Sequence, residues 1–416
     1  MTRSALELPP PAVRTRAAAT ALLLLGAVAL TGATGGPAAA APTFQCDGLK
    51  IGGSLAHTPW AQTRLNFQRA WPVTMGRGVR VAVIDTGLDT RHPQLRDAHV
   101  ERGVNVLPGF PQHDVTDCSG GHGTSVTGVI AAQHVDNVAF VGVAPDVTIV
   151  PIKQTNTNGD KSGNAAGIAA GIDAAIAAKA QVVNISVTVA NPGIGLRAAV
   201  ARAAKNNLII VAAAGNDGQG QNLPAYPAAY STEFPNVIAV SASNVDDVIA
   251  PFSDTGDYVN VAAPGVKVIV AAPVSGYTEL DGTSFAAPYV TGTVALVLGA
   301  HPNLSAEQVR NRIEATADRP PVSVPDRTYG YGIVNPYLAV TTIRDDSLTA
   351  PPTNKGVPLP VPSAPPRADR HLAHVALVSA IVLLGLTLLA SAGAAVLRGR
   401  HRSTQDPPST RIATPL

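Results

Sequence analysis

Three residues of this chain carry the side chains of a nucleophilic hydrolase, namely Asp85, His122 and Ser284. A serine hydroxyl becomes a nucleophile when a histidine accepts its proton, and an aspartate can orient that histidine and stabilise its charged form. Asn216 adds side-chain N–H groups that could stabilise the oxyanion formed by the attack. Taken singly, each residue has a simpler explanation. A serine at a helix start is usually an N-cap, and Asp, His and Asn are common in turns and on surfaces.

The local context of the four residues favours the chemical interpretation. Asp85 ends an apolar strand, Asn216 follows another strand, and His122 and Ser284 stand where helices begin. Functional side chains of α/β sheets gather where strands end and loops begin. We therefore expect Ser284 to attack a carbonyl, with His122 as its base, Asp85 orienting the imidazole and Asn216 binding the oxyanion. Pro288 is expected near the first helical turn, where its missing N–H costs little.

The elements that must position these residues indicate an α/β domain. Strands are predicted at 79–84, 147–152, 182–187, 208–213, 237–240 and 259–262, and helices at 122–135, 163–178, 196–205, 285–300 and 305–317. Continuous apolar strands that alternate with helices are typical of a mostly parallel sheet covered on both faces. The fold class is thus a three-layer α/β domain. Ser305 and Gln308 form a capping box at the last helix, whose Val309 and Ile313 face the core.

The N-terminal segment has the features of a secretory signal. Residues 1–41 contain three arginines, an apolar run from Ala17 to Leu30, and four consecutive alanines at 38–41. This order is typical of a cleaved signal peptide, the alternative being an uncleaved anchor. We expect an N-terminal extension at 42–78 and the main domain at 79–345. The net charge of +2 gives no reason to expect nucleic acid as a partner.

A second apolar segment lies near the C-terminus and predicts a membrane anchor. Residues 375–397 contain no charged side chain, and as a helix they would extend roughly 35 Å, enough for the bilayer core. We predict a transmembrane helix at 373–397, after a proline-rich linker at 346–372 and before a cytoplasmic tail at 398–416. The alternative is a buried soluble helix. The predicted location is the cell membrane, with a single span and the main domain on the extracytoplasmic side.

Cys46 and Cys118 are the two cysteines of the chain. In an exported protein, two cysteines far apart in sequence are typical of one disulfide, the alternative being two free thiols. There is no Cys-x-x-Cys segment. We therefore predict a Cys46–Cys118 bond, no metal site and no cofactor.

Three segments together resemble the catalytic motifs of the subtilases, the subtilisin-like serine proteases. They read VAVIDTG at 81–87, GHGT at 121–124 and GTSFAAP at 282–288, and the order Asp, His, Ser is that of subtilisin. VGVAP at 141–145 and AAGN at 213–216 add to the resemblance. The resemblance implies a subtilisin-like fold and a serine endopeptidase that acts on proteins or peptides.

The layout of the chain resembles the mycosins, membrane-anchored subtilases of type VII secretion systems. It shares with them a signal peptide, a short cysteine-bearing extension, the protease motifs, a proline-rich linker and one terminal span. The resemblance implies that the extension at 42–78 wraps the protease domain. It also implies a type VII secretion membrane complex as partner.

Two departures from the subtilase pattern affect the expected site. Gln94 stands where many subtilases place a calcium-binding aspartate, so no calcium site is carried over. The segment 184–188 corresponds to a Ser-Leu-Gly strand beside the substrate, and the resemblance assigns Ser186, Thr188 and Gly215 to the substrate cleft. Thr188 in place of glycine would crowd that cleft.

Other interpretations remain open at this point. Asp85 and Asp254 both lie in Asp-Thr-Gly segments, the signature of aspartic proteases, whose two carboxylates share a proton. That class would leave His122 and Ser284 without a role, and Asp254 is better explained as a loop residue. The protein could also be mainly a structural subunit of the secretion complex, or a general cell-surface subtilase.

Overall fold

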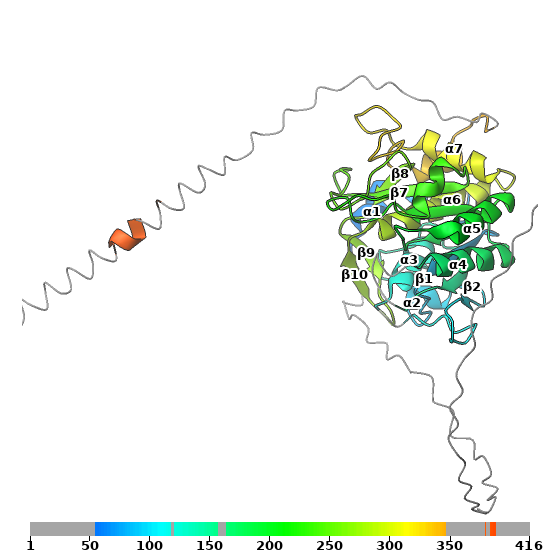
Figure 1. The fold of residues 1–416 in the computed structure, drawn as a ribbon. Coiled ribbons are helices and arrows are strands. Elements are labelled where there is room, and N and C mark those ends of the chain that lie inside the picture. Colours follow the sequence, from blue (N-terminus) through cyan, green and yellow to red (C-terminus); the bar gives the residue numbers. More distant parts are fainter. Residues whose placement is uncertain (1–54, 118–119, 157–163, 347–378, 380–382, 388–416) are drawn as a thin grey trace, which may run out of the picture. The chain divides into compact units, whose positions relative to one another are not determined.

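The computed structural model describes residues 55–117, 120–156, 164–346, 379 and 383–387. Its main body is the segment from 55 to 346 (Figure 1). The expected signal peptide, both cysteines and the tail at 398–416 lie outside the described residues, as does most of the linker at 346–372 and of the span at 373–397.

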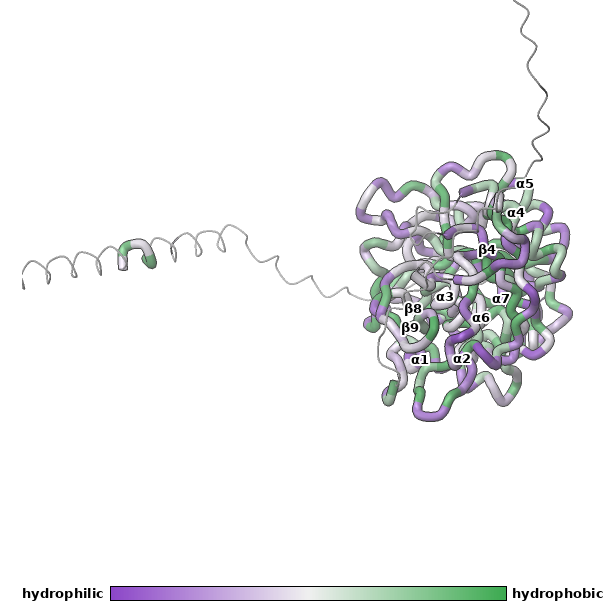
Figure 2. Tube along the Cα trace, turned by 90° about the horizontal axis from the view of Figure 1, so that it is seen from below, coloured by the Kyte–Doolittle hydropathy of each residue, from purple (hydrophilic) through white to green (hydrophobic). Residues whose placement is uncertain are grey.

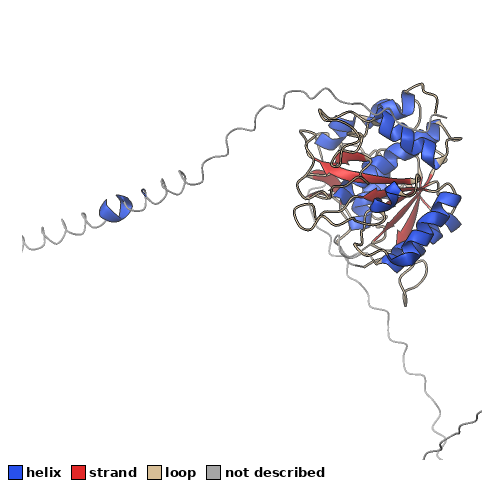
Figure 3. Ribbon diagram, turned by 45° about the horizontal axis from the view of Figure 1, so that its top comes forward, coloured by secondary structure: helices blue, strands red, loops and turns tan. Residues whose placement is uncertain are grey.

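A parallel sheet of eight strands forms the centre of the body (Figure 3). The strands are β1 (Arg80–Asp85), β2 (His99–Val100), β3 (Val104–Asn105), β4 (Thr148–Lys153), β5 (Val182–Ile185), β6 (Ile209–Ala213), β7 (Val237–Ser243) and β8 (Val261–Pro264). Their order is β2-β4-β1-β5-β6-β7-β8, and β3 also pairs with β4. The chain therefore winds first to one side of β1 and then to the other. In open α/β sheets, ligand sites are expected at the carboxyl ends of the strands where the winding reverses in this way.

Helices cover both faces of the sheet, which confirms the predicted three-layer fold (Figure 3). Along β1, Val81 and Val83 belong to the core under α3 (His122–Ala131) and α6 (Thr283–Ala300). Ala82 and Ile84 belong to the opposite core, under α4 (Ala165–Ala177) and α5 (Gly193–Lys205). Alternate residues of a strand point to opposite faces, so a continuous apolar strand fills both cores. Hydrophilic residues recur along the outer loops of the body (Figure 2).

Helix α6 is the central helix of the domain. Within the described ranges it is the one helix long and apolar enough to cross a membrane, but 89% of it is buried inside the domain. A core helix that is apolar all round has this composition. The membrane span at 373–397 stays a prediction, because the structure describes only residues 379 and 383–387 of it.

The remaining elements are short or lie at the edges. They are α1 (Trp60–Leu65), the 3-10 helix η1 (Phe67–Ala70), α2 (Pro93–Arg96), the 3-10 helix η2 (Ala228–Thr232), α7 (Ala306–Thr316), α8 (Pro336–Thr341) and the antiparallel hairpin of β9 (Val268–Ala271) and β10 (Tyr277–Leu280). The predicted capping box of α7 is present, and Val309 and Ile313 are fully buried.

Helix α3 is shorter than predicted. It ends at Ala131 instead of Val135, and Ala132 has an extended backbone with ψ 126°. The N–H of Gly142 donates to the Ala132 carbonyl, and the N–H of Val143 donates to the Val129 carbonyl. These bonds satisfy carbonyls at the helix end, so the chain turns away there.

The described part of the N-terminal extension is packed onto the domain. Phe67 is fully buried, and the indole N–H groups of Trp60 and Trp71 donate to the carbonyls of Lys267 and Val143. The Arg64 guanidinium contacts the carboxylates of two loops far along the chain, Asp247 at 2.7 Å and Asp318 at 2.9 Å. The contacts that hold residues 55–78 to the domain thus include apolar packing, indole hydrogen bonds and a branched ion pair.

Candidate active site

Asp85 and His122 are in direct contact at the carboxyl end of β1. The distance between His122 Nδ1 and Asp85 Oδ1 is 2.7 Å, and the Asp85 side chain is fully buried. The backbone N–H of Thr86 also donates to Asp85 Oδ1. Because a carboxylate oxygen accepts the Nδ1 hydrogen, a neutral His122 has its lone pair on Nε2. The pair therefore has the arrangement of a base and its orienting acid.

The first turn of α3 is fixed to the end of β1 by a glycine. A Cβ atom on Gly123 would lie 2.2 Å from the carbonyl oxygen of Gly87 and 3.2 Å from Asp85 Cβ. Only glycine allows this approach, and it places His122, the first residue of α3, beside Asp85. The ring of His122 also packs on Phe285 with 5.4 Å between centroids.

Asp117 was not expected from the sequence. Its side chain connects the end of β1 to the first turn of α3. Its Oδ1 accepts from the Thr86 hydroxyl at 2.9 Å, and its Oδ2 accepts from the N–H and the hydroxyl of Thr124 at 2.8 and 2.6 Å. The Thr86 hydroxyl in turn accepts from the N–H of Gly123 at 2.8 Å. Burial raises the pKa of the Asp117 carboxyl. An acidic residue shortly before GHGT was the available signal, but its contacts are set by the fold.

Ser284 is the second residue of α6, so its interpretation as an N-cap was wrong. The N-cap is Gly282, and the Ser284 hydroxyl donates to the backbone carbonyl of Ser186 at 2.9 Å. In turn, the Ser186 hydroxyl donates to the backbone carbonyl of Ser284 at 2.8 Å. Two hydrogen bonds thus join the N-terminus of α6 to the segment that follows β5.

Pro288 explains why the Ser284 carbonyl is available to Ser186. The expected position in the first turn was wrong, because α6 begins at Thr283 and Pro288 lies inside the helix. In an α-helix the N–H of residue 288 would donate to the carbonyl of residue 284, and proline has no N–H. The carbonyl that Pro288 leaves unpaired accepts from the Ser186 hydroxyl instead.

The side chain of Asn216 is oriented by Thr283, the first residue of α6. Its Oδ1 accepts from the backbone N–H of Thr283 at 2.8 Å and from the Thr283 hydroxyl at 2.9 Å. This leaves Nδ2 as the donor end of the amide. Gly215 has φ +109°, and a Cβ there would lie 2.0 Å from Asp254 Oδ2, so the turn before Asn216 requires glycine.

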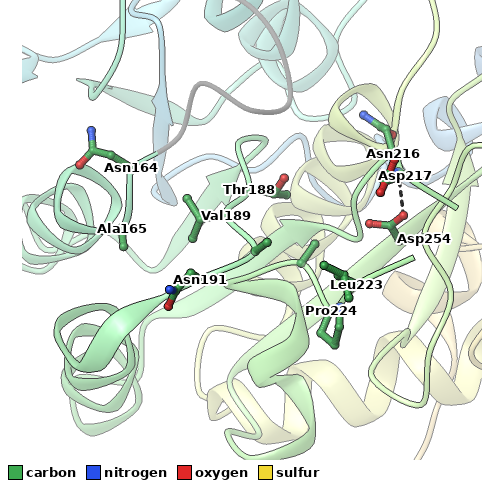
Figure 4. Close-up of a pocket in the computed structure, with 12 residues that line it drawn as sticks. Asn164, Ala165, Thr188, Val189, Asn191, Asn216, Asp217, Leu223, Pro224 and Asp254 are labelled. Atoms are coloured by element: carbon green, nitrogen blue, oxygen red, sulfur yellow. Dashed lines mark hydrogen bonds between the residues drawn. The ribbon is translucent and has the colours of Figure 1, made fainter. Parts of the chain in front are cut away.

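A cavity of about 500 Å³ lies beside this site. Its walls come from the loops after β5, β6 and β7 and from the N-terminus of α4 (Figure 4). The lining residues are Asn164, Ala165, Thr188, Val189, Ala190, Asn191, Asn216, Asp217, Leu223, Pro224, Ala225 and Asp254. Of the residues expected in the cleft, Thr188 lines the cavity, Gly215 lies against the lining residue Asp254, and Ser186 contacts Ser284.

Asp254 does not pair with Asp85, so the aspartic-protease interpretation was wrong. Asp254 accepts from the backbone N–H of Asp217 at 2.7 Å (Figure 4). Its own N–H donates to the Gly215 carbonyl. It is a buried loop residue in the cavity wall, whereas Asp85 contacts His122.

The side-chain amide of Gln94, at the position where many subtilases have a calcium-binding aspartate, is fully engaged in hydrogen bonds to the protein. Its Nε2 donates to the carbonyls of Gln133 and Phe140 at 2.7 and 2.6 Å, and its Oε1 accepts from the Tyr277 hydroxyl at 2.6 Å. No group of three or more His, Cys, Asp or Glu side chains able to hold a metal occurs among the residues that the structure describes. The expected Cys46–Cys118 bond lies outside them.

Comparison with known proteins places this geometry in a family. The profile of the Subtilase family matches residues 76–332. Subtilisin DY of Bacillus licheniformis is 40% identical over 263 residues, which cover 62% of this chain and 90% of subtilisin DY.

Two solved structures are similar over most of the domain. One is MycP1 from the ESX-1 type VII secretion system, with a TM-score of 0.61 and 28% identity over 73% of this chain and 91% of that chain. The other is MycP3 protease from the type VII (ESX-3) secretion system, with a TM-score of 0.59 and 30% identity over 70% of this chain and 91% of that chain. With the family profile matched over more than half of its length, this chain belongs to the Subtilase family and is a serine endopeptidase of the subtilase type.

Proposed function

We propose that this protein is a membrane-anchored, extracytoplasmic serine endopeptidase whose catalytic triad is Asp85, His122 and Ser284. The observation that carries the proposal is the 2.7 Å contact between His122 Nδ1 and a fully buried Asp85. It is supported by the position of Ser284 in the first turn of α6 and by the fixed amide of Asn216.

The proposed mechanism assigns one step to each side chain. His122 accepts the hydroxyl proton of Ser284 at Nε2 while Ser284 Oγ attacks the carbonyl carbon of the scissile peptide bond. The oxyanion receives hydrogen bonds from Asn216 Nδ2 and from the backbone N–H of Ser284, which lies among the unpaired donors at the α6 N-terminus. His122 then gives the proton to the leaving amine, and water hydrolyses the acyl-enzyme. No metal or cofactor takes part in these steps.

We assign the substrate cleft to Ser186, Thr188 and Gly215. The Ser186 carbonyl accepts the Ser284 hydroxyl in the free protein and becomes available to a substrate N–H when Ser284 reacts. Thr188 lines the cavity, where its side chain takes up room that a glycine would leave, and Gly215 lets Asp254 approach its backbone closely. A narrowed cavity favours substrates with small or slender side chains next to the scissile bond.

We further propose that the substrates or partners are proteins of a type VII secretion membrane complex. Support comes from the similarity to MycP1 and MycP3, which are proteins of such systems. The layout expected from the sequence agrees with this role: a signal peptide at 1–41, a span at 373–397, a cytoplasmic tail at 398–416 and a Cys46–Cys118 bond that holds the extension.

The test uses cells that express the full-length chain or its Ser284→Ala variant. A fluorophosphonate probe should label the wild-type chain in intact cells and leave the variant unlabelled. Proteins secreted by the wild type in clipped form should appear uncut with the variant. A wild-type chain that resists labelling would contradict the proposed triad. Secretion that survives Ser284→Ala but fails on deletion of the protein would instead favour a structural role, and unchanged secretion after deletion a general surface protease.

A further inference from the structure

Lys153 is a buried cation that the mechanism above does not use. It is the last residue of β4 and stands in register with Asp85 on the neighbouring strand β1. Only 6% of its surface is exposed. Its Nζ donates to two backbone carbonyls, those of Thr86 and Thr116, both at 2.7 Å.

The two carbonyls belong to the two segments that hold the triad. Thr86 follows Asp85 directly, and Thr116 precedes Asp117, whose carboxylate holds the first turn of α3 through Thr124. One ammonium group therefore joins the end of β1 to the segment that carries His122. A second bridge, from the Thr86 hydroxyl to Asp117, runs parallel to it.

The charges around this bridge are unusual for a protein interior. The side chains of Asp85 and Asp117 are both fully buried, and Lys153 interacts electrostatically with both carboxylates. Burial lowers the pKa of the Lys153 ammonium, while the carboxylates of Asp117, Asp114 and Asp85 oppose that shift. Asp114 is exposed, so solvent screens its charge. Buried charges are costly unless an opposite charge compensates them.

We propose that Lys153 and Asp117 are positioning residues of the triad. Their opposite charges offset each other in the electrostatic potential at His122. The proposal rests on the proposed function, because it concerns the base of that triad. The groups that face His122 and Lys153 are Asp85 from β1, Phe285 from α6, and Asp117 and Asp114 from the segment before α3.

Removal of the Lys153 charge and removal of the Asp117 charge should have opposite effects on the protonation of His122. Removal of the Lys153 charge leaves two buried carboxylates near His122, and a more negative field favours the protonated imidazole. Removal of the Asp117 charge has the reverse effect. His122 must be neutral to accept the Ser284 proton, so activity is lost at low pH when His122 is protonated. The position of this acid limb in the pH profile therefore reports the electrostatic field at His122.

The experiment measures the rate of fluorophosphonate labelling of the full-length chain in membranes from about pH 5 to about pH 9. In Lys153→Met the acid limb should move to higher pH by about half a unit or more, because the interaction of a buried unit charge is weakly screened by solvent. In Asp117→Asn it should move to lower pH. Lys153→Arg, which keeps the charge, should restore the wild-type position. Asp114→Asn is the matched exposed control and should leave the profile in place.

The outcomes separate this inference from the proposed function. A wild-type chain that is not labelled at all contradicts the triad itself. A labelled wild type whose acid limb stays in place in both Lys153→Met and Asp117→Asn, even with slower labelling, shows a purely structural role and overturns the inference. If Lys153→Met fails to fold, the downward shift of Asp117→Asn and the unshifted Lys153→Arg carry the test.

Discussion

At the scale of single residues, the orientation of the Asn216 amide suits its proposed role as the oxyanion donor. Its Oδ1 is committed to Thr283, which supplies both a backbone and a hydroxyl donor. In the proposed mechanism, the amide would therefore meet a developing oxyanion without first reorganising. Preorganised donors of this kind act where charge appears in the transition state, so their loss affects kcat more than KM.

We expect Asn216→Ala to lower kcat by about 10²–10³ with little change in KM, which is the size of the loss for the equivalent donor in a subtilisin. Asn216→Asp is the discriminating control. It keeps an acceptor for the two Thr283 donors but cannot donate to the oxyanion, so it should lose a similar factor. Steady-state kinetics on a peptide substrate measures both variants. Near-normal kcat in Asn216→Asp would show that Asn216 serves α6 and not the oxyanion.

The residues of this candidate site could be proposed from the sequence because the proposed chemistry needs particular residue types. Ser, His, Asp and Asn perform distinct roles, and three of them lie in recognisable segments around Asp85, His122 and Ser284. The same reasoning does not reach Asp117 or Lys153. Their significance comes from hydrogen bonds to backbone atoms of other segments, and the residue type alone does not indicate those partners.

At the scale of elements, the N-terminus of α6 depends on contacts from distant segments. The helix begins two residues before the predicted start because Asn216, which is 67 positions away, accepts the N–H of Thr283. The Ser284 carbonyl that Pro288 leaves unpaired is satisfied by Ser186, 98 positions away. Local sequence rules describe caps within a few residues, so they missed both features.

The pairing of Ser186 with the Ser284 carbonyl gives a testable coupling. Ser186→Ala should lower the free energy of unfolding by about 1–3 kcal/mol, because it leaves a buried carbonyl without its donor. Pro288→Ala supplies an N–H at the position that reaches this carbonyl along the helix. The double variant should therefore be more stable than the sum of the single effects predicts.

Urea unfolding of the four proteins, followed by tryptophan fluorescence, measures this coupling. The two tryptophans, Trp60 and Trp71, both lie in the described body and pack against its core, so their fluorescence reports the domain. Strictly additive effects would contradict the proposed exchange of partners. Thr293→Ala, which removes another hydroxyl bonded to an α6 carbonyl, is the control and should add independently to Pro288→Ala.

At the scale of the whole molecule, the parallel sheet was predictable and its edges were not. Strands such as β1 and β6 are continuous apolar runs, and that pattern is typical of a sheet buried on both faces. The hairpin of β9 and β10 was missed because each strand has four residues and no Asn-Gly or Asp-Gly turn joins them. The branched ion pair of Arg64 was also beyond the sequence, since it joins loops 183 and 254 positions away.

The missed hairpin is held to the domain by a buried histidine. His92 is 1% exposed, and its Nδ1 accepts from the backbone N–H of Gln94 at 3.2 Å. Its Nε2 lies 3.1 Å from the Gly276 carbonyl in the hairpin turn and donates to it. The two contacts together require a neutral ring with its hydrogen on Nε2. Burial lowers the pKa of His92, against smaller opposing effects of the Gly276 carbonyl and Asp89.

This arrangement predicts that the domain loses stability in mild acid. The unfolded chain takes up a proton on this histidine near pH 6.5, whereas the folded chain resists protonation until a lower pH. The free energy of unfolding should therefore fall as the pH drops below about 6.5, by up to about 1.4 kcal/mol per pH unit, until the lowered pKa of folded His92 is reached.

His92→Asn keeps a side-chain acceptor for the Gln94 N–H but cannot titrate. Urea unfolding at about pH 7.5 and about pH 5.5 should show a larger loss for the wild type than for His92→Asn, because the difference isolates this one group from other titrations. Equal losses in the two proteins would mean that the neutral ring of His92 does not contribute to the pH dependence.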